Sequence, residues 1–117
     1  MSEMELGELL AVNFEMANYE FVKYKTKPKD GWNFVEEIVV YGKIGKEGEK
    51  GIEKGKTIGE AVNTTRTLSN TPGGEMTPQL FAKEVQKAAK NTKVKIRVLS
   101  RREIQRLKMG GVLGVSS

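Results

Sequence analysis

The side chains that carry out most enzymatic chemistry are nearly absent from this 117-residue chain. It has no histidine and no cysteine, and Asp30 is its only aspartate. A Ser-His-Asp triad, a Cys-His dyad and a zinc site of Cys and His are therefore excluded. Metal sites built from carboxylates alone remain, but the glutamates are scattered along stretches that we expect to face solvent. We predict no catalytic, cofactor-binding or metal-binding residue in this chain.

Two glycine-rich stretches raise the question of phosphate binding, because exposed N–H groups before a helix attract anions. Gly73-Gly74 is not followed by the Gly-Lys-Ser/Thr of a P-loop, and no strand directly precedes it. The second stretch, residues 110–114, lacks the strand-turn-helix unit of a dinucleotide site. We therefore expect neither stretch to bind a nucleotide. Pro72 and the two glycines instead predict the end of a helix and a sharp turn.

The chain is basic, with a net charge of +5 and an isoelectric point near 9.5. Solubilising lysines explain this balance, and a nucleic-acid patch is the alternative. The densest basic cluster consists of Lys93, Lys95, Arg97, Arg101, Arg102, Arg106 and Lys108. It lacks the interleaved aromatic residues on which a single-strand binder stacks bases. We do not expect nucleic acid as a partner, although a basic nucleic-acid-binding module is the alternative function.

Targeting signals are also missing from the sequence. No apolar run reaches the roughly 18 residues of a membrane span. Residues 1–8 are acidic, unlike a signal peptide, and the lack of cysteine fits a reducing compartment. We expect a cytoplasmic protein with no membrane partner. The sequence stops at Ser116-Ser117 directly after an apolar segment, so we expect more protein to follow.

The first half of the chain has the pattern of helix, turn, strand and long helix. Apolar residues spaced by three and four predict a helix from Leu6 to Tyr24. The β-branched run within residues 34–41 predicts a strand covered on both faces. A long helix follows from about residue 48 to residue 68. Gly51, Gly55 and Gly59 recur every four residues on one face of this helix. They predict that a second backbone packs closely against this face. The alternative is a frayed start of the helix.

The second half predicts helix, strand and helix. Thr77-Pro78 is a helix start and Asn91 its expected end. Alternating apolar and basic residues predict a strand over 94–99. Ser100 and Glu103 form a capping box for a short helix that we expect Gly110 to end. The predicted fold class is therefore α/β, with the order helix, strand, long helix, helix, strand, helix.

Residues 59–72, with the sequence G-E-A-V-N-T-T-R-T-L-S-N-T-P, carry the most specific pattern in the chain. They resemble the linker of the leucyl aminopeptidase (cytosol aminopeptidase) family, in which a helix of pattern A-x-N-x-x-R-x-L-x-N-x-P joins two domains. The resemblance continues to residue 115, while residues 20–25 match more loosely. It implies partial pieces of two α/β domains joined by a linker helix. These are an N-terminal remnant (1–47), a linker helix and turn (48–75), and the first units of a catalytic domain (76–117).

The resemblance implies a peptide hydrolase that uses two divalent ions, zinc, manganese or magnesium, to release N-terminal amino acids, leucine prominently. Family members are typically cytoplasmic homohexamers. Their ligands are a lysine, aspartates and a glutamate, partly within an N-T-D-A-E-G-R motif downstream of position 117, so none carries over to this chain. Gly74 also stands where the family commonly has asparagine.

We therefore expect part of a two-metal leucyl aminopeptidase that is inactive alone. A third interpretation is a non-catalytic assembly partner of an intact aminopeptidase.

Overall fold

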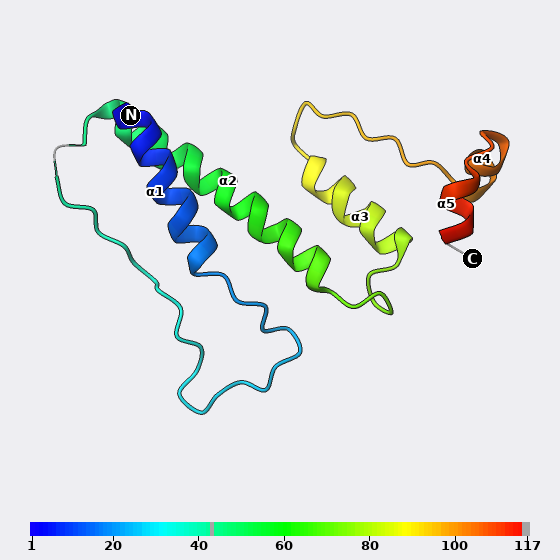
Figure 1. The fold of residues 1–117 in the computed structure, drawn as a ribbon, viewed down its shortest axis with the longest axis horizontal. Helices are drawn as coiled ribbons and strands as arrows, with labels where there is room; N and C mark the ends of the chain where they lie inside the picture. Colours follow the sequence, from blue (N-terminus) through cyan, green and yellow to red (C-terminus); the bar gives the residue numbers. More distant parts are fainter. Residues whose placement is uncertain (43, 116–117) are drawn as a thin grey trace. The chain divides into compact units, whose positions relative to one another are not determined.

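The computed structural model describes residues 1–42 and 44–115, and these residues form α-helices but no β-strand. The predicted α/β class is therefore wrong. The chain divides into two compact units, Met1–Pro72 and Gly73–Ser117. Figure 1 shows the order of the helices along the chain. They are α1 (Glu3–Ala17), α2 (Lys46–Asn70), α3 (Pro78–Ala89), α4 (Arg101–Arg106) and α5 (Gly110–Val115).

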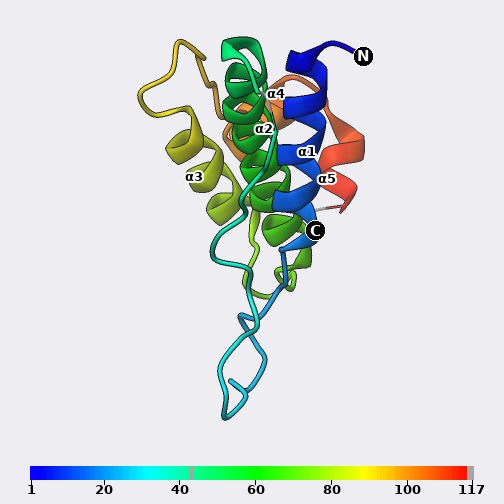
Figure 2. The same cartoon turned by 90° about the vertical axis from the view of Figure 1, so that its left-hand side faces the viewer.

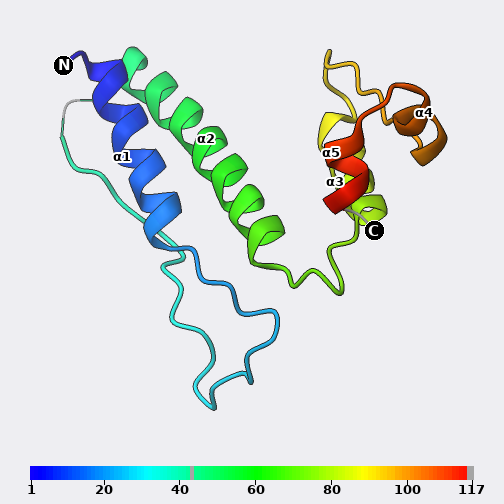
Figure 3. The ribbon, with the colours of Figure 1, turned by 45° about the vertical axis from the view of Figure 1, so that its right-hand side comes forward.

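The first unit is built on α1 and α2, which lie side by side and run in the same direction (Figures 1 and 2). Gly7 in the first half of α1 meets Gly48 near the start of α2. The main chain of Glu15, near the end of α1, accepts a hydrogen bond from Asn63 in the last third of α2. Two parallel helices cannot be joined by a short turn. Residues 18–42 therefore lead away from the end of α1 and then return alongside the pair toward the start of α2, as Figure 3 shows.

The glycine stripe of α2 packs against the backbone of α1, as the sequence predicts. Gly51 faces the main chain of Met4, and Gly55 faces the main chain of Glu8. All four glycines of α2 are buried. A methyl group on Gly55 would also come within 2.9 Å of the Ala11 side chain, closer than carbon atoms can approach. The glycines therefore allow a backbone contact that any larger residue would prevent, and the frayed-helix alternative is wrong.

Residues 34–41 follow the chain as an extended segment without regular structure. A β-strand exists only when a neighbouring strand accepts and donates its main-chain hydrogen bonds. No such neighbour lies beside it in the described part of the chain. The first helix is also shorter than its apolar spacing predicts. It ends at Ala17, with Asn18 as its C-cap, so residues 18–24 are not helical.

The second unit contains the three shorter helices. Thr77 caps α3, and Asn91 just beyond it has the left-handed φ of 69° that a C′ residue adopts. Both features confirm the prediction. Ser100 and Glu103 cap α4 as expected. However, Lys108 (φ 55°) takes the C′ position, and Gly110 instead begins α5.

The predicted strand 94–99 likewise lacks a partner among the described residues and is irregular. Ser116 and Ser117, on which the expectation of further protein rests, lie outside the described residues.

The apolar core is small. Ala11 is the only buried hydrophobic residue among those described, and none of their side chains is fully buried. Large apolar side chains of both extended segments are open to solvent, with Val39 60% and Val94 62% exposed. No described helix is long and apolar enough to cross a membrane.

Candidate functional site

The aminopeptidase-like pattern of residues 59–72 lies on α2, beside the end of α1. Its Asn63 and Arg66 contact the last turn of α1. A helix leaves its last main-chain carbonyl groups without partners, and α1 has no basic residue of its own in its last turn. Two α2 side chains supply the missing donors. Asn63 Nδ2 donates to the carbonyl of Glu15 (2.8 Å), and Arg66 Nη1 donates to that of Met16 (2.9 Å). The positive guanidinium also suits the negative end of the α1 dipole.

Tyr19, the second residue after α1, completes this arrangement. Its ring lies 4.1 Å from the guanidinium carbon of Arg66, within the range of a cation–π contact. Its hydroxyl group lies 3.1 Å from the Thr67 hydroxyl, and Asn70 Nδ2 donates to it at 3.4 Å. We call Tyr19, Asn63, Arg66, Thr67 and Asn70 the α1-end cluster. Tyr19 precedes the other four members by 44 or more positions, so the cluster holds distant parts of the chain together.

Asn18 fixes the extended segment beside the same helix end. Its side-chain amide donates to the Val35 carbonyl (2.9 Å), and its side-chain oxygen accepts from the Val35 amide (2.8 Å). A carboxamide that both donates to and accepts from one residue imitates the peptide group of a neighbouring strand. Val35 is therefore held beside the end of α1, although no sheet forms.

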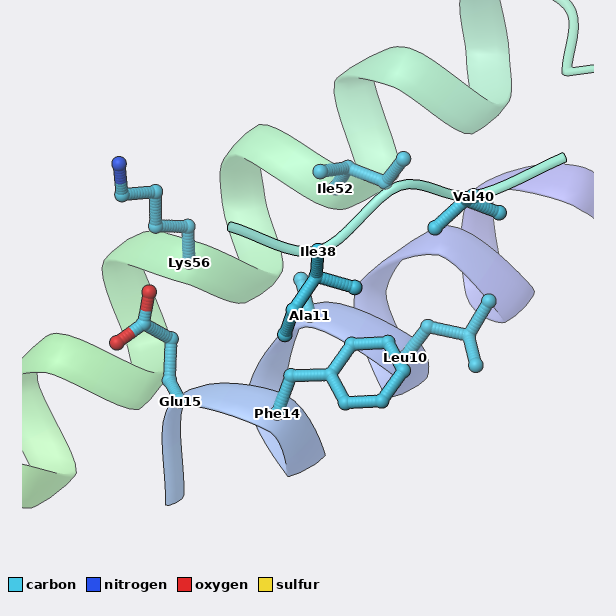
Figure 4. Close-up of a pocket in the computed structure, with 8 residues that line it drawn as sticks. All are labelled: Leu10, Ala11, Phe14, Glu15, Ile38, Val40, Ile52 and Lys56. Atoms are coloured by element: carbon cyan, nitrogen blue, oxygen red, sulfur yellow. The ribbon is translucent and has the colours of Figure 1, made fainter. Parts of the chain in front are cut away.

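A shallow cavity of about 150 Å³ lies between this segment and the two helices. Figure 4 shows Ile38 and Val40 of the segment above α1 and α2, with Glu15 and Lys56 at one end. The rest of the lining is apolar and consists of Leu10, Ala11, Phe14 and Ile52. One carboxylate and one ammonium group beside an apolar wall form no nucleophile–base pair and no metal site.

Metal binding finds no support in the described part of the chain. No group of three or more His, Cys, Asp or Glu side chains there could hold an ion. The expectation that the chain holds no site residue remains a prediction. Gly73 and Gly74 lie in the turn that begins the second unit, with open space where side chains would be. Residues 110–114 form part of the short helix α5.

One carboxyl group has a clearly shifted pKa. The Ser100 main-chain amide, the Ser100 hydroxyl and Arg97 all hydrogen-bond to Glu103, and they lower its pKa below the usual value. A carboxyl group with a lowered folded-state pKa stabilises the fold above its unfolded-state pKa. The contribution disappears as the pH falls through the folded-state value. We therefore expect ionised Glu103 to support the α4 capping box at neutral pH and to lose this contribution in acid.

Comparison with known proteins identifies the family. Residues 63–117 match the profile of the cytosol aminopeptidase family, catalytic domain. The chain is 36% identical over 110 residues to a "Probable cytosol aminopeptidase" of Rickettsia canadensis, and 38% identical over 108 residues to that of Rickettsia typhi. The chain belongs to the cytosol aminopeptidase family. The alignments cover 93% and 92% of the chain but only 22% of each relative. No solved structure matches the chain.

Membership of the cytosol aminopeptidase family confirms the resemblance on which the sequence interpretation rests, and with it a peptide hydrolase as the parent family. The structure also gives Asn63 and Arg66, two residues of this pattern, a physical role. Asn63 and Arg66 are three positions apart, so they share one face of α2 and reach α1 together. Sequence reasoning singled out the pattern that contains Asn63 and Arg66 but missed Tyr19 and Asn18. No spacing rule marks these two residues, because their partners lie far away in the sequence.

Proposed function

We propose that this chain is part of a two-metal leucyl aminopeptidase that releases N-terminal amino acids from peptides. The family match supports peptide hydrolysis by the parent protein. Two divalent ions, manganese or zinc, would polarise the scissile carbonyl and supply hydroxide in such an enzyme. The described residues offer no ligand set for these ions, so no catalytic step is assigned to them. The chain is proposed to be inactive alone.

The contribution of this chain is structural, and the α1-end cluster is the observation that supports it. Asn63 and Arg66 match the linker pattern of the family and bind the end of α1 to α2. Residue 63 is also where the match to the catalytic domain begins. We propose that α2 holds the N-terminal remnant (1–47) to the beginning of the catalytic domain (76–117) through residues 48–75.

The remaining properties follow the family. We propose peptide substrates, a cytoplasmic location and assembly into a homo-oligomer, a hexamer in the family. The relatives are named cytosol aminopeptidases, which supports the location.

The proposal is tested by assaying hydrolysis of a leucine anilide with Mn²⁺ or Zn²⁺. We expect the 117-residue chain to give no turnover above a buffer blank. A chimaera in which it replaces the aligned segment of the Rickettsia typhi relative should retain activity. Asn63→Ala and Arg66→Ala together should lower the activity of the chimaera, whereas Lys50→Ala, on the exposed side of α2, should not.

Turnover by the 117-residue chain itself would show that it contains a catalytic centre and would contradict its proposed inactivity. An inactive chimaera beside an active parent would contradict the proposed structural equivalence.

A further inference from the structure

The cavity between residues 34–41 and the helix pair has one charged end and one apolar end. Glu15 of α1 and Lys56 of α2 lie at the charged end, and Leu10 and Val40 lie toward the other (Figure 4). A glutamate and a lysine carry opposite charges at neutral pH. The cavity therefore presents both signs of charge beside an apolar wall.

These two charged groups are not used by the fold. Other charges of the same helices are paired, as Lys54 Nζ is with Glu8 at 2.7 Å. In contrast, neither the Glu15 carboxylate nor the Lys56 ammonium forms a hydrogen bond or an ion pair with another residue that the structure describes. Both groups are therefore free to bind a ligand.

Glycine packing brings the two charges to the same end of the cavity. The stem of Glu15 lies so close to Gly59 that a methyl group on this glycine would overlap the Glu15 side chain. Lys56 precedes Gly59 by three positions, so the two residues share one face of α2. The close contact of the helices thus sets the carboxylate of α1 beside the ammonium of α2.

The apolar part of the cavity has the size of one side chain. Enclosed apolar cavities of about 150 Å³ hold a benzene molecule in other proteins, and this cavity has about that volume. Phe14, Ile38 and Val40 in its wall are 39%, 46% and 40% exposed. A branched aliphatic or phenyl group that covers them would remove apolar surface from water.

A second hollow, of about 260 Å³, adjoins the charged end. It shares four lining residues with the first cavity, which are Phe14, Glu15, Ile38 and Lys56. Glu36 lines only the second hollow and adds another carboxylate, while the Asn18 amide beside it is occupied by Val35. The second hollow therefore suits the charged part of a small molecule whose apolar part enters the first.

We propose that these joined cavities bind a free α-amino acid with an apolar side chain. Its ammonium group contacts Glu15 and Glu36, its carboxylate contacts Lys56, and its side chain covers the apolar wall. A free amino acid carries both charges on one carbon atom, next to its side chain. A fatty acid would leave the carboxylates of the site without a partner, and an apolar amine would leave Lys56 without one. Binding needs no metal ion and no catalytic group, so it does not depend on peptide hydrolysis.

The test is a titration of the complete chain with L-leucine, followed by the amide signals in proton–nitrogen NMR spectra. We expect saturable shifts for residues 10–15 and 52–56, with a dissociation constant of about 1 mM or lower. Three smaller probes each lack one part of leucine. Isocaproate lacks the ammonium group, isoamylamine lacks the carboxylate, and glycine lacks the apolar side chain. Each should bind about fivefold more weakly or worse, because one contact is missing.

Two variants remove the charges with little change of shape. Glu15→Gln should weaken leucine and isoamylamine about fivefold or more but leave isocaproate unchanged, and Lys56→Met should weaken leucine and isocaproate but leave isoamylamine unchanged. The matched controls are Glu53→Gln and Lys50→Met, at exposed positions of α2 that line neither hollow. They should bind leucine within about twofold of the unaltered chain. The NMR spectrum of each variant establishes that it is folded.

Several results would overturn the proposal. One is the absence of saturable shifts with leucine, and another is leucine-induced shifts that lie outside residues 10–15 and 52–56. Isocaproate, isoamylamine or glycine that binds as tightly as leucine would show a site for a carboxylate, an amine or charge alone. Leucine binding that is equal in the site variants and the controls would show that Glu15 and Lys56 do not hold the ligand. The comparison of probes on the unaltered chain decides the matter even if a variant fails to fold.

Discussion

At the scale of single residues, Arg66 acts on three groups at once. Its guanidinium donates to the Met16 carbonyl and to Asn63 Oδ1, and it stacks on the Tyr19 ring. A lysine carries the same charge but lacks the planar fork that can donate in two directions while stacking. This geometry accounts for an arginine at this place in the family-like pattern.

We predict that Arg66→Ala lowers the free energy of unfolding of the first unit by about 1–2 kcal/mol, because the Met16 carbonyl loses a charged donor. Arg66→Lys should recover only part of this loss. Urea unfolding followed by the fluorescence of Trp32, the only tryptophan of the chain, measures the change. Lys50→Ala is the control, since its exposed pair with Glu47 adds little. Equal stability of Arg66→Ala and the unaltered chain would show that the α1-end cluster contributes nothing.

At the scale of elements, glycines decide how α1 and α2 meet. A glycine inside a helix costs up to about 1 kcal/mol relative to alanine, yet α2 has four buried ones. The cost is offset because two helix backbones approach more closely than side chains would permit. The hydrophobic residues of α2 are few, so this close contact replaces an ordinary apolar interface.

We predict that Gly55→Ala destabilises the first unit by about 1–3 kcal/mol despite its better helix propensity, because the new methyl group would overlap the main chain of Glu8. Gly111→Ala is the matched control, since open space surrounds that helical glycine. It should leave stability unchanged or raise it slightly. Thermal unfolding followed by circular dichroism compares the two variants. A Gly55→Ala protein as stable as the control would refute the close packing.

At the scale of the whole molecule, neither unit buries much apolar surface. A chain of this length can form only one modest hydrophobic core, and here it is divided between two small units. Small cores give a small free energy of unfolding. The extended segment 34–41 adds main-chain groups and apolar side chains that no neighbouring strand covers. Exposed edges of this kind invite pairing with another chain.

We predict that the isolated chain unfolds over a broad temperature range and associates at high concentration through residues 34–41. Val39→Lys should reduce this association without loss of helix, because Val39 points to solvent and a charge blocks edge pairing. Ile38→Lys is the contrasting variant. Its side chain lines the cavity over α1 and α2, so a charge there should also loosen the helix pair. Sedimentation velocity and circular dichroism distinguish these effects. A sharp melt of a monomer would contradict the prediction.

Much of the helical structure could be predicted from local patterns. Thr77-Pro78, the Ser100–Glu103 box and the glycine stripe act within a few residues, so their physics is visible in the sequence. The strands could not be predicted in this way. Residues 34–41 and 94–99 have the composition of strands, but a strand is completed by a partner that may lie anywhere in a protein. The first helix was predicted too long because apolar spacing continues beyond Ala17, while Asn18 turns away to bind Val35.

The sequence by itself determined the absence of histidine and cysteine, the N-caps of α3 and α4, the glycine contact and the resemblance to the cytosol aminopeptidases, because each depends on residue types or short spacings. Only the tertiary structure decided that Asn63 and Arg66 bind the α1 carbonyls, that Tyr19 stacks on Arg66, and that Asn18 binds Val35. These features depend on which distant residues meet. That choice follows from the packing of the whole chain, which no local pattern contains.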